Sequence, residues 1–536
     1  MANQNNPFYP VVYVRGYAMT EGDIDETAAD PFCGYNVGST IFRAVAGQNQ
    51  APRKFVFESP VVRLATDYKY GTTYSDGYEL SDAEWQPNEI TGFPERCVVI
   101  LRYYDSAAEL LGGKAAPKIP DAANQLRDLI EKLKKQVMAL PDRGGLDTPD
   151  DFRCYLVAHS MGGLVCRAFL QNAPAPGKAD MRQYVDKFFT YATPHNGIDV
   201  AGINVPKWLS TDAANNFNLG IMADYLNLKA EFEETQRVDW LPSGPLPPER
   251  VFCMVGTNRS DYEVAMGASR TFVGHGSDGL VRIENATLTG RDSVDKSETP
   301  CAKAFTYRSH SGKFGIINGE ESYQNLTRFL FGDFRVNIWA DIESFRLPPE
   351  VVTDAGVTKK INALYQFELL ASPRGKPWYL SRRIAEEDSV ACLTQQDWDA
   401  AGGAKSLYLS TVFLSNLAKM DKNDPTLAYS VTLGIRVPDY ELDGILWMKQ
   451  HFEGGYLFRK TFIIRLSPPA DGQGWEVEYD SPEDSTIPRT VKQIPVATAG
   501  NPGEISIPFD NPAQPGVTGN LRFAFSPWNV DRIKLK

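Results

Sequence analysis

Short apolar segments alternate with helical patterns over about the first 335 residues of the chain. Five segments have the length and composition of buried strands: 11–14, 97–103, 155–158, 188–192 and 251–255. Between the second and the third, apolar residues recur at three- and four-residue steps, as on one face of a helix: Leu126, Leu129, Ile130, Leu133 and Val137. Strands that alternate with helices predict an α/β fold, with a mostly parallel sheet and flanking helices.

A second pattern begins after Phe331, where polar and apolar residues alternate with a period of two. Three segments show it: 429–437, 475–479 and 521–525. Three more segments are further candidate strands: 365–370, 407–414 and 456–466. This alternation is typical of antiparallel strands that have one buried and one solvent-facing side. Together these segments predict an antiparallel β-sandwich.

The two patterns predict two domains, as expected for 536 residues, which is more than one hydrophobic core usually organises. We place an α/β domain at 1–335 and a β-sandwich domain at 336–536. Within the first, 20–96 has room for an insertion. Segment 197–250 falls between two predicted core strands and is either a lid or a surface helix pair. It carries several apolar residues: Trp208, Met222, Tyr225, Leu226 and Leu228.

Composition and charge exclude several partners and cofactors. A net charge of −12 and a pI near 5.1 leave no basic face for nucleic acid and favour a neutral or weakly anionic substrate. The seven cysteines and five histidines contain no Cys-x-x-Cys or His-x-x-x-His pair, so we expect no disulfide framework, no metal and no other cofactor. We see no signal peptide and no apolar run of membrane-spanning length, and therefore expect a cytoplasmic protein.

One serine lies between a predicted strand and a predicted helix, in the run Ala158-His159-Ser160-Met161-Gly162-Gly163. Small residues stand two positions before and two positions after Ser160. A tight strand-to-helix turn needs such residues, and it exposes the serine hydroxyl at the carboxyl edge of a sheet. The pattern indicates a nucleophile, with an inert serine in an ordinary turn as the alternative.

An acid and a histidine follow Ser160 in the order that a hydrolytic triad on a parallel sheet requires. Asp278 lies in a short turn after the segment 251–255, and His310 precedes a predicted helix that begins near residue 317. The rival acid is Asp199, which follows the preceding strand. The other histidines are less well placed in the chain: His159, His195, His275 and His451. We therefore expect Ser160, His310 and Asp278 to act as nucleophile, base and orienting acid.

An oxyanion next to Ser160 needs two hydrogen-bond donors. The backbone N–H of Met161, which follows the nucleophile, supplies one. The predicted strand 11–14 ends near Gly16, so the N–H of Tyr17 is the candidate for the other. A strand followed by an ordinary turn is the alternative for Tyr17.

These residues resemble bacterial lipases and lipase-like inositol deacylases, a branch of the α/β-hydrolase superfamily. The resemblance covers about residues 8–332 and rests on short motifs: AHSMGG at 158–163, TPHNG at 193–197, SDGLV at 277–281 and HSGKFGIIN at 310–318. One departure concerns the oxyanion strand, which ends in His-Gly in that family and in Arg15-Gly16 here. The resemblance implies an α/β-hydrolase fold for this part of the chain.

The expected function is therefore cleavage of carboxylic esters, by an esterase or lipase that forms an acyl-enzyme on Ser160. An acyltransferase with the same triad and a non-catalytic binding protein on a hydrolase scaffold are the alternatives. The expected partner is a small-molecule or lipid ester. The β-sandwich is a candidate for contact with a membrane surface or a polymer.

Overall fold

The computed structural model describes these residues: 8–16, 35, 39–43, 53–57, 59–72, 93–103, 118–140, 148–200, 203–204, 216–260, 276–312, 314–349, 361–419, 421, 423–442, 450–468, 474–483, 488–494 and 502–529. Backbone proximity divides the chain into two compact units. The first comprises Met1–Lys303 and Arg308–Leu326, and the second comprises Ala304–Tyr307 and Thr327–Lys536. The main boundary between the units thus falls between Leu326 and Thr327, a few residues before the predicted domain boundary at 335. The short segment Ala304–Tyr307 also belongs to the second unit.

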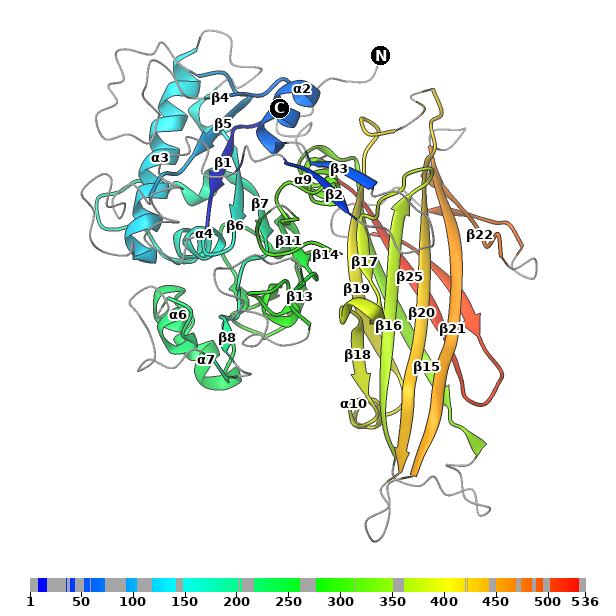
Figure 1. The fold of residues 1–536 in the computed structure, drawn as a ribbon. Helices are drawn as coiled ribbons and strands as arrows, with labels where there is room; N and C mark the ends of the chain where they lie inside the picture. The colour runs from blue at the N-terminus through cyan, green and yellow to red at the C-terminus, as the bar shows by residue number, and fades with distance from the viewer. Residues whose placement is uncertain are drawn as a thin grey trace. The chain divides into compact units, whose positions relative to one another are not determined.

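A mostly parallel sheet organises the first unit (Figure 1). Its strands follow the order β14 (Ala302–Thr306), β11 (Val251–Gly256), β7 (Val185–Tyr191), β6 (Cys154–His159), β1 (Val11–Val14), β5 (Cys97–Ile100) and β4 (Gly71–Thr72). Every pair from β11 to β4 is parallel. The five strands predicted from apolar runs are β1, β5, β6, β7 and β11, so the parallel core is confirmed. They are buried almost throughout, as expected for a sheet covered on both faces.

Helices flank this sheet. They are α2 (Pro60–Tyr68), α3 (Ile119–Ala139), α4 (Gly162–Gln171) and α9 (Glu320–Phe331). The predicted apolar stripe of α3 is buried, and α3 packs beside α4. Figure 1 shows α3 and α4 on one side of the sheet, and α2 and α9 on the other. An ion pair of 2.8 Å between Arg63 and Glu320 links α2 to α9.

Shorter elements complete the first unit. They are β2 (Ser39–Arg43), β3 (Arg53–Phe57), β8 (Asp199–Val200), β9 (Ile203–Asn204), α6 (Leu219–Tyr225), α7 (Lys229–Thr235), β10 (Trp240–Pro242), β12 (Thr289–Arg291) and β13 (Glu298–Pro300). Single 3-10 turns occur at Pro149–Asp151, Arg182–Tyr184, Pro248–Arg250 and Ile283–Asn285. The strands β10, β12 and β13 form a small sheet of their own.

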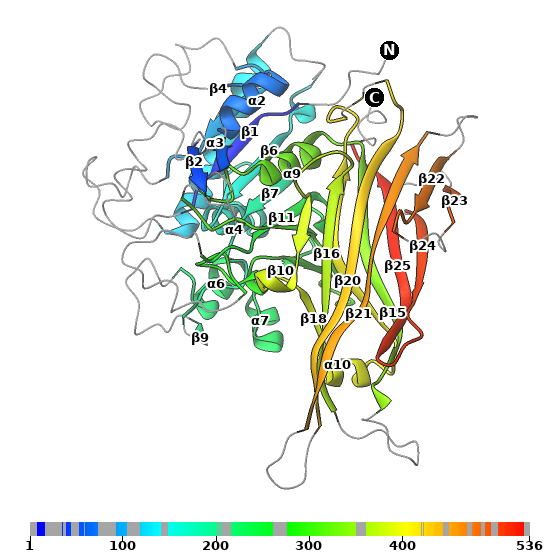
Figure 2. The ribbon, with the colours of Figure 1, turned by 45° about the vertical axis from the view of Figure 1, so that its right-hand side comes forward.

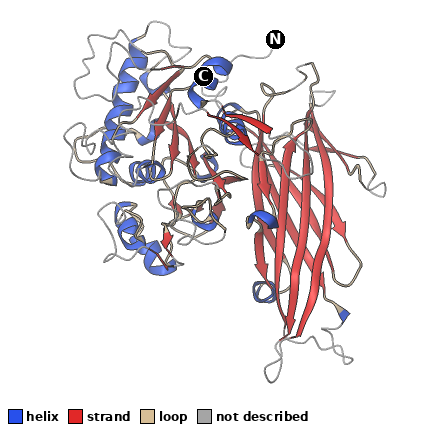
Figure 3. Cartoon of the chain, in the orientation of Figure 1, coloured by secondary structure: helices blue, strands red, loops and turns tan. Residues whose placement is uncertain are grey.

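Long antiparallel strands make up the second unit, whereas most helices belong to the first (Figure 3). One sheet has the order β19 (Lys405–Leu414), β15 (Phe334–Arg346), β25 (Gly516–Pro527) and β24 (Gly503–Asp510). The other has the order β17 (Ser381–Arg383), β16 (Ile361–Pro373), β20 (Leu427–Leu442), β21 (Gln450–Ser467), β22 (Trp475–Asp480) and β23 (Thr490–Ile494), with β18 (Ala391–Thr394) also on β16. The helix α10 (Gln395–Ala400) and a 3-10 turn at Ala385–Glu387 lie in the connections. Figure 2 separates the layer of β24 and β25 from that of β20 and β21.

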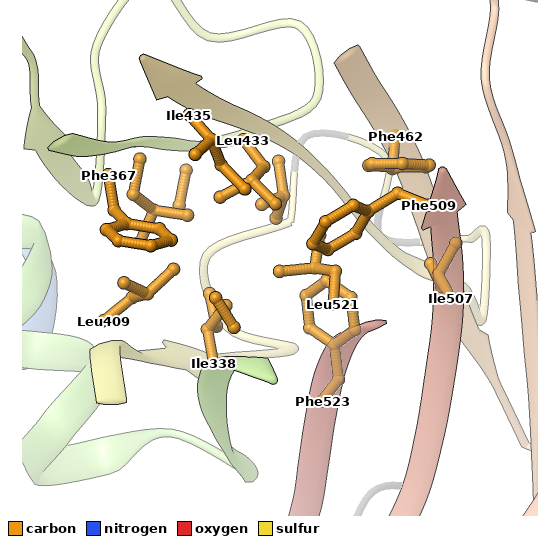
Figure 4. Close-up of a cluster of buried hydrophobic side chains, with 14 of the residues drawn as sticks. Ile338, Phe367, Leu409, Leu433, Ile435, Phe462, Ile507, Phe509, Leu521 and Phe523 are labelled. Atoms are coloured by element: carbon orange, nitrogen blue, oxygen red, sulfur yellow. The ribbon is translucent and has the colours of Figure 1, made fainter. Parts of the chain in front are cut away.

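Alternate side chains from the two sheets fill one shared core (Figure 4). Ile338, Leu521 and Phe523 come from the first sheet, and Phe367 and Leu433 face them from the second. In β24 buried positions alternate with exposed or partly exposed ones, as expected for a strand with one solvent-facing side. The expected antiparallel β-sandwich is confirmed.

Three of the core strands of the first unit each carry a buried cysteine, at Cys97, Cys154 and Cys253. Burial raises the pKa of Cys253 to about 11, so this thiol stays protonated and packs as a small apolar group. All six cysteines within the described ranges are free thiols. In that same part of the chain, no helix has both the length and the apolar character needed to cross a bilayer.

Candidate active site

Ser160 occupies the turn that joins β6 to α4. Its φ of +53° lies in the left-handed region, which costs a residue with a side chain about 1–3 kcal/mol. Its backbone N–H donates to the Tyr191 carbonyl of β7 at 2.9 Å, which holds the turn against the sheet. A Cβ on Gly162 would overlap the Val14 carbonyl of β1, so only glycine fits there. The predicted tight turn is therefore present, and it places the Ser160 side chain at the carboxyl end of β6.

The structure brings Ser160, His310 and Asp278 into one line of hydrogen bonds. The Ser160 Oγ lies 2.9 Å from His310 Nε2, and His310 Nδ1 lies 2.9 Å from Asp278 Oδ2. The three residues are 5%, 3% and 1% exposed, respectively. Because the Asp278 carboxylate only accepts hydrogen bonds, His310 Nδ1 carries a proton and neutral His310 presents an unprotonated Nε2 to the Ser160 hydroxyl. This is the protonation state that a general base for Ser160 needs.

Hydrogen bonds to backbone groups fix the positions of Asp278 and His310. Asp278 Oδ1 accepts from the N–H groups of Leu280 at 3.0 Å and Val281 at 2.8 Å. The His310 N–H donates to the Asp278 carbonyl at 3.0 Å. A Cβ on Gly256, the last residue of β11, would stand 2.9 Å from Asp278 Cβ, so this glycine lets the acid turn approach the strand. The sequence does not identify Gly256 as part of the site, because the residues next to it in the chain do not show that the Asp278 turn packs against it.

One of the two candidate oxyanion donors is described, and it follows the serine directly in the chain. The N–H of Met161 stands at the N-terminus of α4, where backbone donors and the helix dipole favour negative charge. Tyr17 lies outside the described residues, so its role stays a prediction. The preceding Gly16 is described, and its Cα packs so closely on the turn that an added Cβ would overlap Ser160 Cβ and stand 2.9 Å from Met161 N. The end of β1 therefore meets the turn at the expected place.

Replacing Gly16 with alanine is expected to lower kcat/KM for an ester by about 100-fold, because the added methyl group must displace Ser160 or the Met161 N–H. Steady-state hydrolysis of a chromogenic ester measures the loss. Gly244→Ala is the matched control, since a Cβ there meets only the Pro242 carbonyl oxygen, at an ordinary 3.7 Å. Full activity in Gly16→Ala would show that the end of β1 is not part of the site.

Two other histidines are buried near the ends of β6 and β7. His159 precedes the serine, and its Nε2 lies 2.9 Å from the His310 carbonyl oxygen. His195 follows β7, and its Nε2 lies 3.3 Å from Thr190 Oγ1. In both cases burial is the main cause that lowers the pKa well below 6.5, so both are neutral. His275 and the side chain of His451 lie outside the described residues.

Replacing His195 with glutamine is expected to make the free energy of unfolding less sensitive to acid. Burial, and then the charge of Arg167, lower the pKa of folded His195 well below 6.5, so at lower pH the unfolded chain binds a proton that the folded chain excludes. The contribution of His195 is therefore full above pH 6.5, and it falls by up to about 1.4 kcal/mol per pH unit below it. Urea unfolding of both proteins at pH 7 and pH 5.5 tests this. The same pH dependence in the two proteins would contradict a depressed pKa.

The candidate lid is described only in part. Asp199 contributes backbone to β8, but its side chain lies outside the described part of the segment, as does Trp208. Three of the apolar residues, Met222, Leu226 and Leu228, are fully buried, so they do not present an open apolar face. One contact reaches the site, because Asn216 Nδ2 lies 3.9 Å from Met161 Sδ. The segment thus borders the residue after the nucleophile.

The helix that follows Ser160 also anchors parts of this segment and the residue His195 just before it. Arg167 of α4 is fully buried, and three backbone carbonyls accept from its guanidinium: His195 at 2.9 Å, Val238 at 2.7 Å and Trp240 at 2.8 Å. Two more bonds reach the end of α6: Gln171 Nε2 to Leu226 O and Asn172 Nδ2 to Tyr225 O, both 2.8 Å. The junction between α6 and α7 and the backbone that follows α7 are therefore fixed to the helix that follows the serine. Sequence reasoning missed Arg167, since one arginine in an amphipathic helix normally faces solvent.

No arrangement of three or more His, Cys, Asp or Glu side chains that would suit a metal ion occurs among the described residues. The groups that meet at Ser160 are its hydroxyl, the His310 imidazole, the Asp278 carboxylate and the backbone N–H of Met161. Such a set performs proton transfer and nucleophilic attack on a carbonyl carbon.

Comparisons with known proteins add little to this geometry. The sequence matches none of the protein-family descriptions and none of the curated proteins against which it was compared. Among solved structures, it is similar to "the gene lin2722 products from Listeria innocua". That match has 11% sequence identity and a TM-score of 0.26, and covers 60% of this chain and 93% of that chain. With so low a TM-score, this likeness carries no argument about chemistry.

Proposed function

We propose that this protein is a serine hydrolase of the α/β-hydrolase superfamily that cleaves carboxylic esters through an acyl-enzyme on Ser160. The observation that carries the proposal is the unbroken line from Asp278 through His310 to Ser160, with both links at 2.9 Å. The left-handed backbone of Ser160 supports it, because such strain persists mainly where function requires it. The sequence resemblance to lipases agrees with the same residues.

In the proposed mechanism, Ser160 Oγ attacks the ester carbonyl carbon and its proton passes to His310 Nε2. Asp278 stabilises the resulting imidazolium without taking its proton. The N–H of Met161 donates to the oxyanion of the tetrahedral intermediate. His310 then gives the proton to the leaving alkoxide oxygen, and the C–O bond of the ester breaks.

Deacylation repeats these steps with water in place of the serine. His310 Nε2 takes a proton from water, the hydroxide oxygen attacks the acyl carbon, and a second oxyanion forms at the same donors. Collapse of this intermediate returns the proton to Ser160 Oγ and releases the acid. The same three residues thus serve both half-reactions.

The chemistry favours an ester over other substrates. Glycoside cleavage uses two carboxylates that flank the bond, and phosphoryl transfer usually needs metal ions or clustered positive charge. The line of residues here ends on a single carboxylate that contacts the histidine. We expect an ester with an apolar acyl or alcohol part, since the net charge of −12 disfavours strongly anionic substrates.

A panel of chromogenic esters graded by acyl-chain length tests the proposal. We expect turnover of at least part of the panel, together with labelling of Ser160 by a fluorophosphonate, identified by peptide mass spectrometry. Amide and phosphodiester substrates of the same leaving group serve as comparison. Faster hydrolysis of either class than of every ester would overturn the substrate class, even with Ser160 labelled.

A further inference from the structure

His159 is the residue of the serine turn that the proposed mechanism does not use. It is 4% exposed, and its ring lies beside that of His310, with centroids 5.0 Å apart. Its Nε2 lies 2.9 Å from the His310 carbonyl oxygen, although the two residues are 151 positions apart in the chain. The residue before the nucleophile therefore contacts the loop that carries the base.

The partner atom determines which nitrogen of His159 carries the proton. A carbonyl oxygen only accepts hydrogen bonds, so His159 Nε2 must be the donor and the ring must have its proton there. Burial, followed by the nearby His310 and Arg15, lowers the pKa of His159 well below 6.5. A neutral ring adds no positive charge next to the imidazolium that forms on His310 during catalysis.

With this bond, His310 is held at four points. Its N–H donates to the Asp278 carbonyl, and its carbonyl accepts from His159. Its two ring nitrogens contact Asp278 and Ser160. The Asp278 bonds alone fix His310 to the acid turn, whereas the His159 bond fixes it to the strand that ends in the nucleophile.

We propose that His159 is a positioning residue for the serine hydrolase reaction: its Nε2–H locks the His310 loop onto the end of β6 and so sets the distance between His310 Nε2 and Ser160 Oγ. This inference rests on the proposed function. Its role is indirect, since His159 Nε2 bonds to the backbone of His310 and not to the groups that react. Distances between a base and its nucleophile matter steeply, and a misplacement of about 1 Å can cost about 100-fold in rate.

Two substitutions of His159 distinguish the effect of its N–H donor from the effect of its ring volume. His159→Phe removes the N–H and keeps an aromatic ring, and we expect kcat for an ester to fall by about 10- to 100-fold with KM within about twofold. His159→Gln keeps an N–H near the position of Nε2, and we expect it to retain kcat within about threefold of wild type. His195→Phe is the matched control, because it also removes a buried histidine but does not touch the His310 loop, and it should retain kcat.

A spectroscopic measurement on the wild-type protein tests the same bond without any variant. With only five histidines in the chain, nitrogen-15 labelling of histidine and long-range proton–nitrogen correlation can assign each ring. His159 should be the Nε2–H tautomer and should not titrate between pH 6 and pH 9. A proton on Nδ1, or equal kcat values in His159→Phe and wild type, would overturn the inference and leave the proposed function standing. Wild-type protein that neither hydrolyses esters nor reacts with a fluorophosphonate would overturn the proposed function, and the positioning role with it.

Discussion

Ser160→Ala is expected to lower ester turnover by about a million-fold, to the level of the background reaction, with the fold intact. The acyl-enzyme needs the Ser160 oxygen, and alanine leaves His310 Nε2 without the hydroxyl that it contacts in wild type. Alanine retains the left-handed backbone that the Tyr191 carbonyl holds, so the midpoint of thermal unfolding should stay close to that of wild type. Initial rates on the best ester of the panel, followed over hours for the variant, measure the loss.

Fluorophosphonate labelling provides the second measurement for this variant. Wild type should be labelled at Ser160, and Ser160→Ala should not be labelled at all. Ser322→Ala is the matched control, because Ser322 is a fully buried serine of α9 whose hydroxyl has no hydrogen-bond partner among the described residues. This control should be labelled and active. Labelling of Ser160→Ala at another serine would move the nucleophile to that residue.

Much of the fold was predictable because burial leaves a periodic trace in the sequence. The strands β6, β7 and β11 are buried on both faces, so they appear as continuous apolar runs. The sandwich strands alternate over part of their length: in the predicted segment 429–437 of β20, the apolar positions 429, 431, 433, 435 and 437 are buried. Elements with two or three residues, such as β4 and β12, are too short to show a period, and the small sheet of β10, β12 and β13 was not predicted.

The candidate site was predictable where local chemistry marks it. Ser160 stands between small residues in a strand-to-helix pattern, and the chain order favours His310 as the base while it leaves both Asp278 and Asp199 as possible acids. Ser160, His310 and Asp278 meet in the structure, while their roles in catalysis stay predictions. The hydrophobic pattern predicts which face of a strand is buried. It does not predict which distant backbone atom a given side chain contacts. For that reason the carbonyl partners of Arg167 and His159, which belong to segments around Ser160, were not predictable.

The choice between the two candidate acids rests on a comparison of Asp278→Asn with Asp199→Asn. Asp199 is the carboxylate that follows β7 and was the alternative from the sequence. We expect Asp278→Asn to lower kcat by about ten-thousand-fold and Asp199→Asn to change it by less than about threefold. If Asp199→Asn is instead the inactive variant and Asp278→Asn retains most of its rate, then the acid comes from the segment after β7.

The hydrogen bonds around Asp278 explain why replacing one of its carboxylate oxygens with an amide nitrogen should lower kcat so strongly. The N–H groups of Leu280 and Val281 require an acceptor at the Oδ1 position, so the amide oxygen of an asparagine takes that place. The amide NH2 then faces His310 Nδ1 and forces this nitrogen to accept, which moves the ring proton to Nε2. In that tautomer His310 Nε2 points a proton at Ser160 Oγ and cannot remove one from it. Nitrogen-15 shifts of His310 in Asp278→Asn should therefore show the Nε2–H tautomer where wild type shows Nδ1–H, together with the loss of turnover and of fluorophosphonate labelling at Ser160.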